Sequence, residues 1–507
     1  MRVFQTALIF LVLSIFSPCY AENPPLFEAT LKIEIGEDLG QGLGTLFEAI
    51  DEHGRVILGA GLNDIHSTYV RDNNRILDFY YRGMNTQRTF QRLTKPFSDE
   101  CNGSRLILDG DHLLTYFREG NPINLSQVQN DGTIKPYEGI SKADQEAFSG
   151  IQYVNNHRLV FHPYRVTCDG KEVYRTDKGS LYYYVKGKLF VYQGGEPGTL
   201  LVYKWNPSVD AAVTGEPEKF EASGYLFIYG TSGDEVVLVT NIGCIYSYKD
   251  GHLTQLRNTD GQSWQGYSWT AWYDHHVIGH YPTGSLMEYA DGKVDLFEPA
   301  IPVPPGASSA AREAQTLTIY GGDLYAGVWP WGELWRLDSD THAWEFVQRV
   351  FDKPEISQDT APYEVEMKDK PDVINYWGQR IMNLVGTSDG LYISTMNKQG
   401  KPYNPKTHDF MTPEIISQYG MLHKMSGVVQ VSKQLEWKPV TELRFTYDPG
   451  CIRIYQDGKL LEEKNLSEEA GLEGRTVSAL HVGKGVYGPF AGKVLSSSAM
   501  ANGKQLN

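Results

Sequence analysis

The sequence is poor in cysteine, in long apolar runs and in basic residues. Five of the 507 residues are cysteine, too few for a small fold that depends on disulfides. Lysine and arginine number 46 against 62 aspartate and glutamate, a formal net charge of −16. This balance argues against a general nucleic-acid binder, which needs a basic face. Beyond the first 21 residues no apolar run approaches the roughly 18 residues of a membrane-spanning helix, so we expect no membrane span.

Recognisable catalytic signatures are also lacking. The sequence contains no glycine-rich phosphate loop, HExxH, GxSxG or paired CxxC motif. Any chemistry must therefore come from residues that the fold brings together. Once residues 1–21 are removed, four cysteines remain, and they leave open one or two disulfides or four buried thiols.

The first 21 residues have the pattern of a secretory signal peptide. Arg2 gives a positive start, residues 7–16 are a short apolar run, and Ala21 ends a small-residue cleavage site. Ser17 and Pro18 suit a lipoprotein attachment at the neighbouring cysteine poorly. We therefore expect residues 1–21 to be removed and the mature protein to be secreted or periplasmic.

Glycine, proline and aromatic residues are abundant and occur in internal repeats. The clearest unit, Leu317–Val347, reads as four strands separated by Gly-Gly, Pro-Trp-Gly and Asp-rich turns. The preceding unit, Trp269–Tyr289, aligns with its first half. In this alignment His280–Gly284 corresponds to Val328–Gly332 of the clearest unit. The clearest unit resembles a kelch-type propeller blade.

Hairpin turns recur along the chain at fairly regular intervals. Most intervals are near the roughly 40–50 residues of a four-stranded blade. The turns lie near Gly54, Gly110, Asn156, Gly187, Gly233, Asp274, Gly322 and Gly390. We predict an all-β chain, a β-propeller of seven or eight four-stranded blades over residues 22–425, with seven preferred. Residues 426–507 should form a β-hairpin segment that completes the last blade or packs on the propeller, and the strand at 27–35 could close the ring against it.

The candidate site lies on the loops between the second and third strands of the blades. In propellers these loops open on one face, which is the default ligand site by analogy with the fold. Histidine and tyrosine adjoin on three of them, tryptophans occupy a fourth, and arginines precede two first strands. These candidates are His66, Tyr69, His162, Tyr164, Arg165, His280, Tyr281, Arg312, Trp329, Trp331 and Arg380.

These residue types suit an acidic polysaccharide. Histidine transfers protons near neutral pH, arginine binds carboxylate or sulfate bidentately, and aromatic faces suit sugar rings. We assign Trp329 and Trp331 to the binding of sugar rings. We expect His66, Tyr69, Arg312 and Arg380 to bind the substrate as well. No cofactor is required, although a structural or charge-neutralising divalent cation, calcium or zinc, stays open. The turn Asp338–His342 could hold calcium through carboxylate oxygens, but a simple turn is the commoner interpretation.

In length, signal peptide and blade pattern the chain resembles the secreted propeller lyases that cleave uronate polysaccharides, especially the ulvan lyases of marine bacteria. The resemblance implies β-elimination: a base removes the C5 proton of the uronic acid, a cation neutralises its carboxylate, and an acid protonates the oxygen leaving C4. We predict His162 or His280 as the base, Tyr164 or Tyr281 as the acid, and Arg165 as the neutralising cation. The family's own catalytic residues do not align with this sequence.

Three other functions stay open. A non-catalytic glycan-binding protein would use the same aromatic residues, and a protein-interaction scaffold would use the same blades. A glycoside hydrolase needs two facing carboxylates, and only Glu196 and Asp64 lie near the candidate loops. An anionic polysaccharide partner conflicts with the net charge of −16 unless Arg165, Arg312 and Arg380 concentrate positive charge at the site. We expect a monomer.

Overall fold

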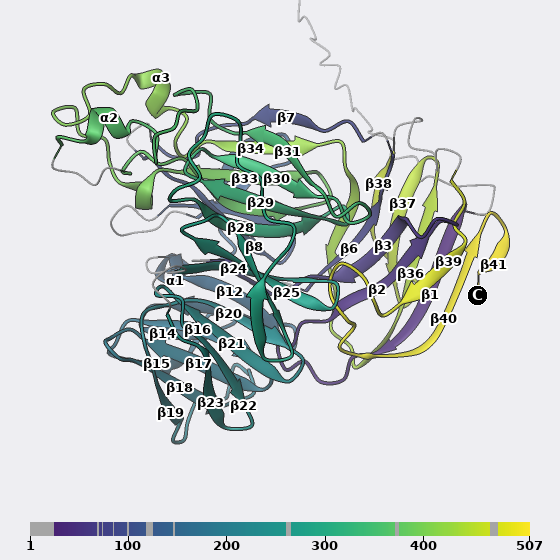
Figure 1. Cartoon of the computed structure of the whole chain (residues 1–507). Helices are drawn as coiled ribbons and strands as arrows, with labels where there is room; N and C mark the ends of the chain where they lie inside the picture. The colour runs from purple at the N-terminus through teal and green to yellow at the C-terminus, as the bar shows by residue number, and fades with distance from the viewer. Residues whose placement is uncertain are drawn as a thin grey trace, which may run out of the picture.

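The computed structural model describes residues 25–67, 70–73, 75–84, 86–98, 101–117, 125–145, 148–259, 265–370, 375–466 and 475–506. The predicted signal peptide, 1–21, lies outside these residues. The described chain forms a ring of small sheets and a two-sheet sandwich beside it, at the right of Figure 1. It is an all-β protein with the architecture of a β-propeller, as the repeats predicted.

The described residues of the ring contain seven four-stranded antiparallel units. Five are separate sheets, and two are parts of one ten-stranded sheet. The first four are β8–β11 (Arg105–Asp109, His112–Tyr116, Ser126–Val128, Ile134–Pro136), β12–β15 (Gly150–Val154, His157–His162, Arg165–Cys168, Lys171–Arg175), β16–β19 (Ser180–Val185, Lys188–Gln193, Gly198–Lys204, Glu218–Ala222) and β20–β23 (Leu226–Ser232, Glu235–Thr240, Ile245–Lys249, His252–Arg257). The next two are β24–β27 (Gln265–Trp272, His275–Tyr281, Leu286–Ala290, Lys293–Leu296) and β28–β31 (Glu313–Tyr320, Asp323–Trp329, Glu333–Leu337, Trp344–Arg349).

The seventh unit joins the two ends of the ring. Its strands β32 (Arg380–Gly386), β33 (Leu391–Met396) and β34 (Leu422–Ser426) come last in the ring, but its outer strand β7 (Thr89–Arg92) precedes the first unit in sequence. Strand β7 pairs antiparallel with β34. This pairing ties the segment that precedes the first unit to the last unit, which closes the ring.

Neighbouring units pack through buried apolar side chains. The inner strands explain why runs such as Val236–Val239 are apolar at every position. Val236 and Leu238 pack toward β16–β19, whereas Val237 and Val239 pack toward β24–β27, because a strand presents alternate side chains to its two faces. Equivalent cores join every adjacent pair, ending with Leu106 of the first unit against Tyr392 of the seventh.

The sandwich is built from both ends of the chain. One sheet has the order β38 (Lys459–Asn465), β37 (Cys451–Gln456), β36 (Val440–Asp448), β1 (Phe27–Glu34), β40 (Lys493–Ala501), β41 (Lys504–Leu506). The other has the order β35 (Val429–Gln434), β6 (Ile76–Tyr81), β3 (Val56–Leu62), β2 (Gly44–Ile50), β39 (Ala479–Val482). Their inner faces share one apolar core that includes Phe47, Phe79 and Phe445.

The sandwich changes the predicted domain boundaries. Strand β1 does pair with the C-terminal segment, through β36 and β40, but it forms this sandwich and closes no blade. The turn near Gly54 joins β2 to β3 of the sandwich, whereas the other seven predicted turns join first and second blade strands. The propeller therefore begins near Thr89, not at residue 22. The C-terminal strands needed a facing sheet for their apolar sides, and the N-terminal strands supply it.

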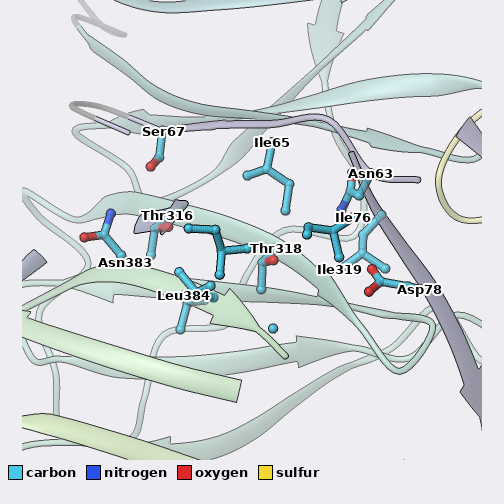
Figure 2. Close-up of a pocket in the computed structure, with 13 residues that line it drawn as sticks. Asn63, Ile65, Ser67, Ile76, Asp78, Thr316, Thr318, Ile319, Asn383 and Leu384 are labelled. Carbon is cyan, nitrogen blue, oxygen red and sulfur yellow. The ribbon is translucent and has the colours of Figure 1, made fainter. Parts of the chain in front are cut away.

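A hairpin of the sandwich polypeptide enters the ring. Strand β4 (Ile65–Ser67) pairs with β24, and β5 (Val70–Asn73) pairs with β12, so the hairpin connects the first strands of two non-adjacent units. We call β4–β5 the plug, because it occupies the ring between these strands. Figure 2 shows Asn63, Ile65 and Ser67 at a cavity of about 50 Å³ between this hairpin and the first, sixth and seventh units.

Helices are few and short. They are α1 (Lys142–Gln145), α2 (Glu364–Met367), the 3₁₀ turn η1 (Lys398–Gly400) and α3 (Pro413–Ile416), and α2 and α3 lie at the upper left of Figure 1, away from the sandwich. Within the described chain, no helix has the length and apolar character to cross a bilayer. The cysteines Cys101, Cys168, Cys244 and Cys451 are free and buried.

Candidate functional site

The sandwich covers one end of the propeller. Its strand β35 and the following residues contact the turns between first and second blade strands: Gln430 Oε1 accepts from the Gly321 N–H at 2.8 Å, and Asn156 Oδ1 accepts from the Trp437 N–H at 3.0 Å. The loops between second and third strands therefore lie at the opposite end. That end holds most of the predicted site residues. The interface with the sandwich holds the groove that is described below.

The predicted group His162, Tyr164 and Arg165 is assembled on one unit, but its histidine is enclosed. The His162 side chain is 1% exposed, and its Nε2 lies 3.2 Å from Asp144 Oδ1. Burial, aided by Arg165, lowers the pKa of His162 to about 4, so the imidazole is neutral near pH 7. Arg165 donates to the Ala143 carbonyl at 2.6 Å. Only Tyr164 is largely exposed.

The second predicted pair, His280 and Tyr281, lies far from the first. His280 is buried, and its Nε2 lies 3.5 Å from Thr283 Oγ1. His162 is on β13 and His280 on β25, with β12, β5, β4 and β24 between them in the ten-stranded sheet. Five strand spacings correspond to roughly 24 Å along the sheet. The two histidine–tyrosine pairs therefore cannot act on one sugar as a single acid–base set.

His66 belongs to the plug and not to a loop between second and third strands. It is completely buried, its Nε2 lies 3.1 Å from Asp64 Oδ1, and its ring meets Tyr183 edge-on at 4.8 Å. The predicted position of His66 on the loop face is wrong, because Gly54 was taken as a blade turn and the register of the following residues was derived from it. Tyr69 lies outside the described residues.

The two tryptophans cannot offer a ring face to a sugar. Trp329 and Trp331 are each 1% exposed. The guanidinium of Arg380 lies 5.9 Å from the Trp329 ring, and that of Arg349 lies 5.5 Å from the Trp331 ring. These indoles are packed inside the propeller, whereas sugar binding requires an exposed ring face. The repeat pattern placed both on the loop between the second and third strands; Trp329 in fact ends β29, and Trp331 lies in the loop to β30. Sequence could not show their burial.

The predicted concentration of positive charge is neutralised. Arg312 is buried and donates to Glu333 Oε2 at 2.6 Å, and Arg380 contacts Glu313 at 3.1 Å. Burial raises the pKa values of Glu313 and Glu333, although their arginine partners oppose the rise. A buried arginine with a carboxylate partner has little charge left for a ligand. The partner glutamates lie on first and third blade strands, which the loop-based prediction did not consider.

The carboxylates of the acidic turn Asp338–His342 bind arginine side chains. Arg82 Nη1 lies 2.6 Å from Asp340, and Arg336 Nη1 donates to Asp338 at 2.9 Å. Burial would raise the pKa of Asp338, but Arg82, the Thr341 N–H and Arg336 lower it to about 2. Both carboxylates of the proposed calcium turn thus already have cationic partners.

Three side chains of the β12–β15 unit are close enough together to be tested as a zinc site. His157, Cys168 and Asp169 offer one atom each within 4.8 Å of one another. His157 Nδ1 already lies 2.6 Å from Asp169 Oδ2, and burial raises the pKa of the Cys168 thiol to about 12. Zinc binds the thiolate, so this group is a poor match for the predicted cation.

A groove between the sandwich and the β28–β31 unit is the largest of the cavities described here, about 470 Å³. We call it the interdomain groove. Its volume falls within the range of small-ligand sites, which favour domain interfaces. Five arginines and four carboxylates stand among its lining residues. These charged residues are Arg55, Arg82, Arg88, Arg336, Arg475, Asp323, Asp338, Asp340 and Glu345.

Three of the arginines are fully engaged with carboxylates. Arg82 donates to Asp323 at 2.8 Å as well as contacting Asp340. Arg336 donates to Asp323 and to Glu345, each at 2.6 Å. Arg55 pairs with Asp51 at 2.8 Å. These paired side chains form a polar wall along the groove, and their carboxylates already accept hydrogen bonds.

The remaining two arginines are not matched in this way. Arg88 Nε donates to the Tyr325 hydroxyl at 3.1 Å, and its Nη2 lies 3.8 Å from Asp323. Arg475 Nη2 donates to the main-chain carbonyl of Arg82, and its Nε is buried with no hydrogen-bond partner. Sequence reasoning missed all of these residues, because they come from separate segments. The one available signal was the acidic turn at Asp338, which was considered for calcium and not for arginine.

No family model matches the chain, and no curated protein does. Solved structures to which it is similar include YCF48 bound to D1 peptide (11% identity, covering 68% of this chain and 98% of that one, TM-score 0.39) and BamB from Moraxella catarrhalis (12%, 77% and 91%, TM-score 0.26). A third is the β-propeller domain of Cps50 (Swd1) from Myceliophteria thermophila (11%, 52% and 89%, TM-score 0.33). The sheet topology itself identifies the chain as a β-propeller that carries a sandwich formed by its two ends.

Proposed function

We propose that this protein is a non-catalytic binding protein that holds a saccharide in the interdomain groove. The observation that carries the proposal is the groove itself, a ligand-sized cavity of about 470 Å³ lined by guanidinium and carboxylate groups. Guanidinium and carboxylate groups have more donor and acceptor sites than their mutual pairs use, so a polyhydroxylated ligand can accept hydrogen bonds from the guanidinium groups and donate to the carboxylates. The wall of paired side chains is preformed, which reduces the ordering cost of binding.

The state of the predicted catalytic residues supports binding over cleavage. His162 and His280 are 1% and 3% exposed, and they lie on separate units. A general base must come within hydrogen-bonding reach of the proton it removes. Neither imidazole meets this condition without rearrangement of its surroundings.

A saccharide panel tests the proposal. Isothermal titration calorimetry of the purified protein against neutral, uronate and sulfated oligosaccharides should give saturable binding to at least one of them. Chromatography of the same ligand after overnight incubation should show an unchanged chain length. Shortened products would overturn the non-catalytic assignment. Absence of binding to every saccharide would favour the alternative of a protein-interaction scaffold.

Uronate lyase activity is the second candidate, and one observation favours it. A neutral imidazole at His162 adjoins the guanidinium of Arg165 and the exposed Tyr164, which are the three kinds of group that β-elimination uses. On this alternative, ultraviolet absorbance should rise on uronate polysaccharides, and His162→Ala should abolish the rise. His252→Ala, which removes an exposed histidine on β23, serves as the control. Full activity of His162→Ala would remove this candidate mechanism.

A further inference from the structure

We propose that the ligand of the interdomain groove carries an anionic group, a carboxylate or a sulfate ester, received between Arg88 and Arg475. This inference rests on the proposed function, because it names the chemistry of the ligand in the same groove. The two guanidinium groups come from different parts of the molecule. Arg88 lies just before the propeller strand β7, and Arg475 lies before the sandwich strand β39.

The Arg475 side chain provides the first argument. Among the described residues it pairs with no carboxylate, and its buried Nε has no hydrogen-bond partner. No described carboxylate balances the charge of this guanidinium, and an anion in the groove that Arg475 lines would balance it.

The Arg88 side chain provides the second argument. Among the described residues its one carboxylate contact is the 3.8 Å approach to Asp323, whose oxygens lie closer to Arg82 and Arg336. Its Nε donates to a neutral hydroxyl, that of Tyr325. The positive charge of Arg88 is therefore poorly compensated within the protein, and its free N–H groups can receive an oxyanion.

The charge of the whole molecule provides the third argument. A net charge of −16 repels an acidic saccharide from most of the surface. The five arginines of the groove are matched by four lining carboxylates and by Asp51, which pairs with Arg55, so these ten side chains carry no net charge. The groove therefore lacks the negative charge of the molecule as a whole. Arg55, Arg82 and Arg336 are paired closely with carboxylates, which leaves Arg88 and Arg475 to bind an anion.

A matched pair of ligands tests the anionic requirement. An oligogalacturonate and its methyl ester have the same hydroxyls but differ in charge, and a sulfated neutral oligosaccharide separates sulfate from carboxylate recognition. Calorimetry should show the acid binding at least about tenfold more tightly than the ester, the effect of losing hydrogen bonds to a charged group. Tighter binding of the sulfated sugar would identify sulfate as the anion, and tighter binding of the galacturonate would identify carboxylate.

Two variants locate the anion. Arg88→Gln and Arg475→Gln should each weaken acid binding about tenfold and leave the ester unaffected. Arg92→Gln, which removes an exposed arginine outside the groove, should leave both unchanged. Thermal melts verify that each variant is folded, and Arg88→Gln retains the test if Arg475→Gln unfolds. Affinity for both the acid and the sulfated sugar no higher than for the uncharged ester, or variants that leave the preference for the anionic ligand intact, would overturn the inference while the proposed function stands. No binding of any saccharide would contradict both.

Discussion

The Arg82 guanidinium reaches from the sandwich to the Asp323 carboxylate on the propeller, with 2.8 Å between Nη2 and Oδ1. Arg82 directly follows β6, and Asp323 begins β29. The two side chains are 8% and 6% exposed, so this ion pair is buried at the interface and also forms part of the groove wall. It connects the stability of the interface to the shape of the groove.

Replacing Arg82 should destabilise the protein strongly. Arg82→Gln removes the partner that Asp323 and Asp340 share, and breaking a buried pair costs up to about 3–5 kcal/mol. Arg336 still pairs with Asp323, which lowers the cost below this limit. The expected result is a lower midpoint of unfolding in urea. Arg92→Gln removes an exposed pair with Asp352 and should cost less than about 1 kcal/mol. Equal midpoints for the two variants would contradict the role of Arg82.

Glu48 should make stability depend on pH in a predictable direction. Burial raises its pKa from the ordinary 4.5 to about 7, although the Val486 N–H and Arg82 oppose the rise. Between these values the folded chain keeps a proton that the unfolded chain has lost. The stabilisation by the protonated form is therefore complete below about pH 4.5 and is lost as the pH rises through 7.

Glu48→Gln isolates this effect, because glutamine resembles the protonated carboxyl at every pH. Urea unfolding at pH 5 and pH 8 should show the variant gaining free energy of unfolding relative to the parent as the pH rises. Glu52→Gln, at an exposed position in the neighbouring turn, should keep a constant difference. A Glu48→Gln difference that stays constant would mean that Glu48 ionises normally.

Close packing between neighbouring units makes Gly279 intolerant of a side chain. A Cβ there would fall inside contact distance of the Ala314 carbonyl on the next unit, and the strand backbone cannot move away. Gly279→Ala should cost about 1–3 kcal/mol. Gly150→Ala is the matched control, because its Cβ would have only Phe161 nearby, at 3.6 Å. Similar thermal midpoints for both variants would refute this packing argument.

The fold was largely predictable because its information is local. Turns such as Gly110, Gly187 and Gly322 repeat with the spacing of a blade, and alternating apolar runs mark the inner strands. The sandwich was not predictable in this way, because β1 and β36 are more than four hundred residues apart and pairing leaves no local signal. The same distance led the turn at Gly54 to be read as part of a blade.

The candidate site was much less predictable. Loop position correctly placed His162 beside Arg165, but sequence could not show that Trp329 is buried or that Arg312 pairs with Glu333. These facts depend on side chains of other strands. The interdomain groove depends on Arg88 and Arg475, which are nearly four hundred residues apart. Residues of this kind are brought together only by the packing of the sandwich on the propeller.

The most direct test of the account is to fill the interdomain groove and measure saccharide affinity. Met84 lines the groove and is 52% exposed, so Met84→Trp adds bulk there without disturbing a core. Leu460→Trp makes a comparable change at an exposed position outside the groove. By titration calorimetry with the best ligand of the panel, Met84→Trp should lose binding and Leu460→Trp should retain it. Undiminished binding by Met84→Trp would contradict the assignment of the groove as the ligand site.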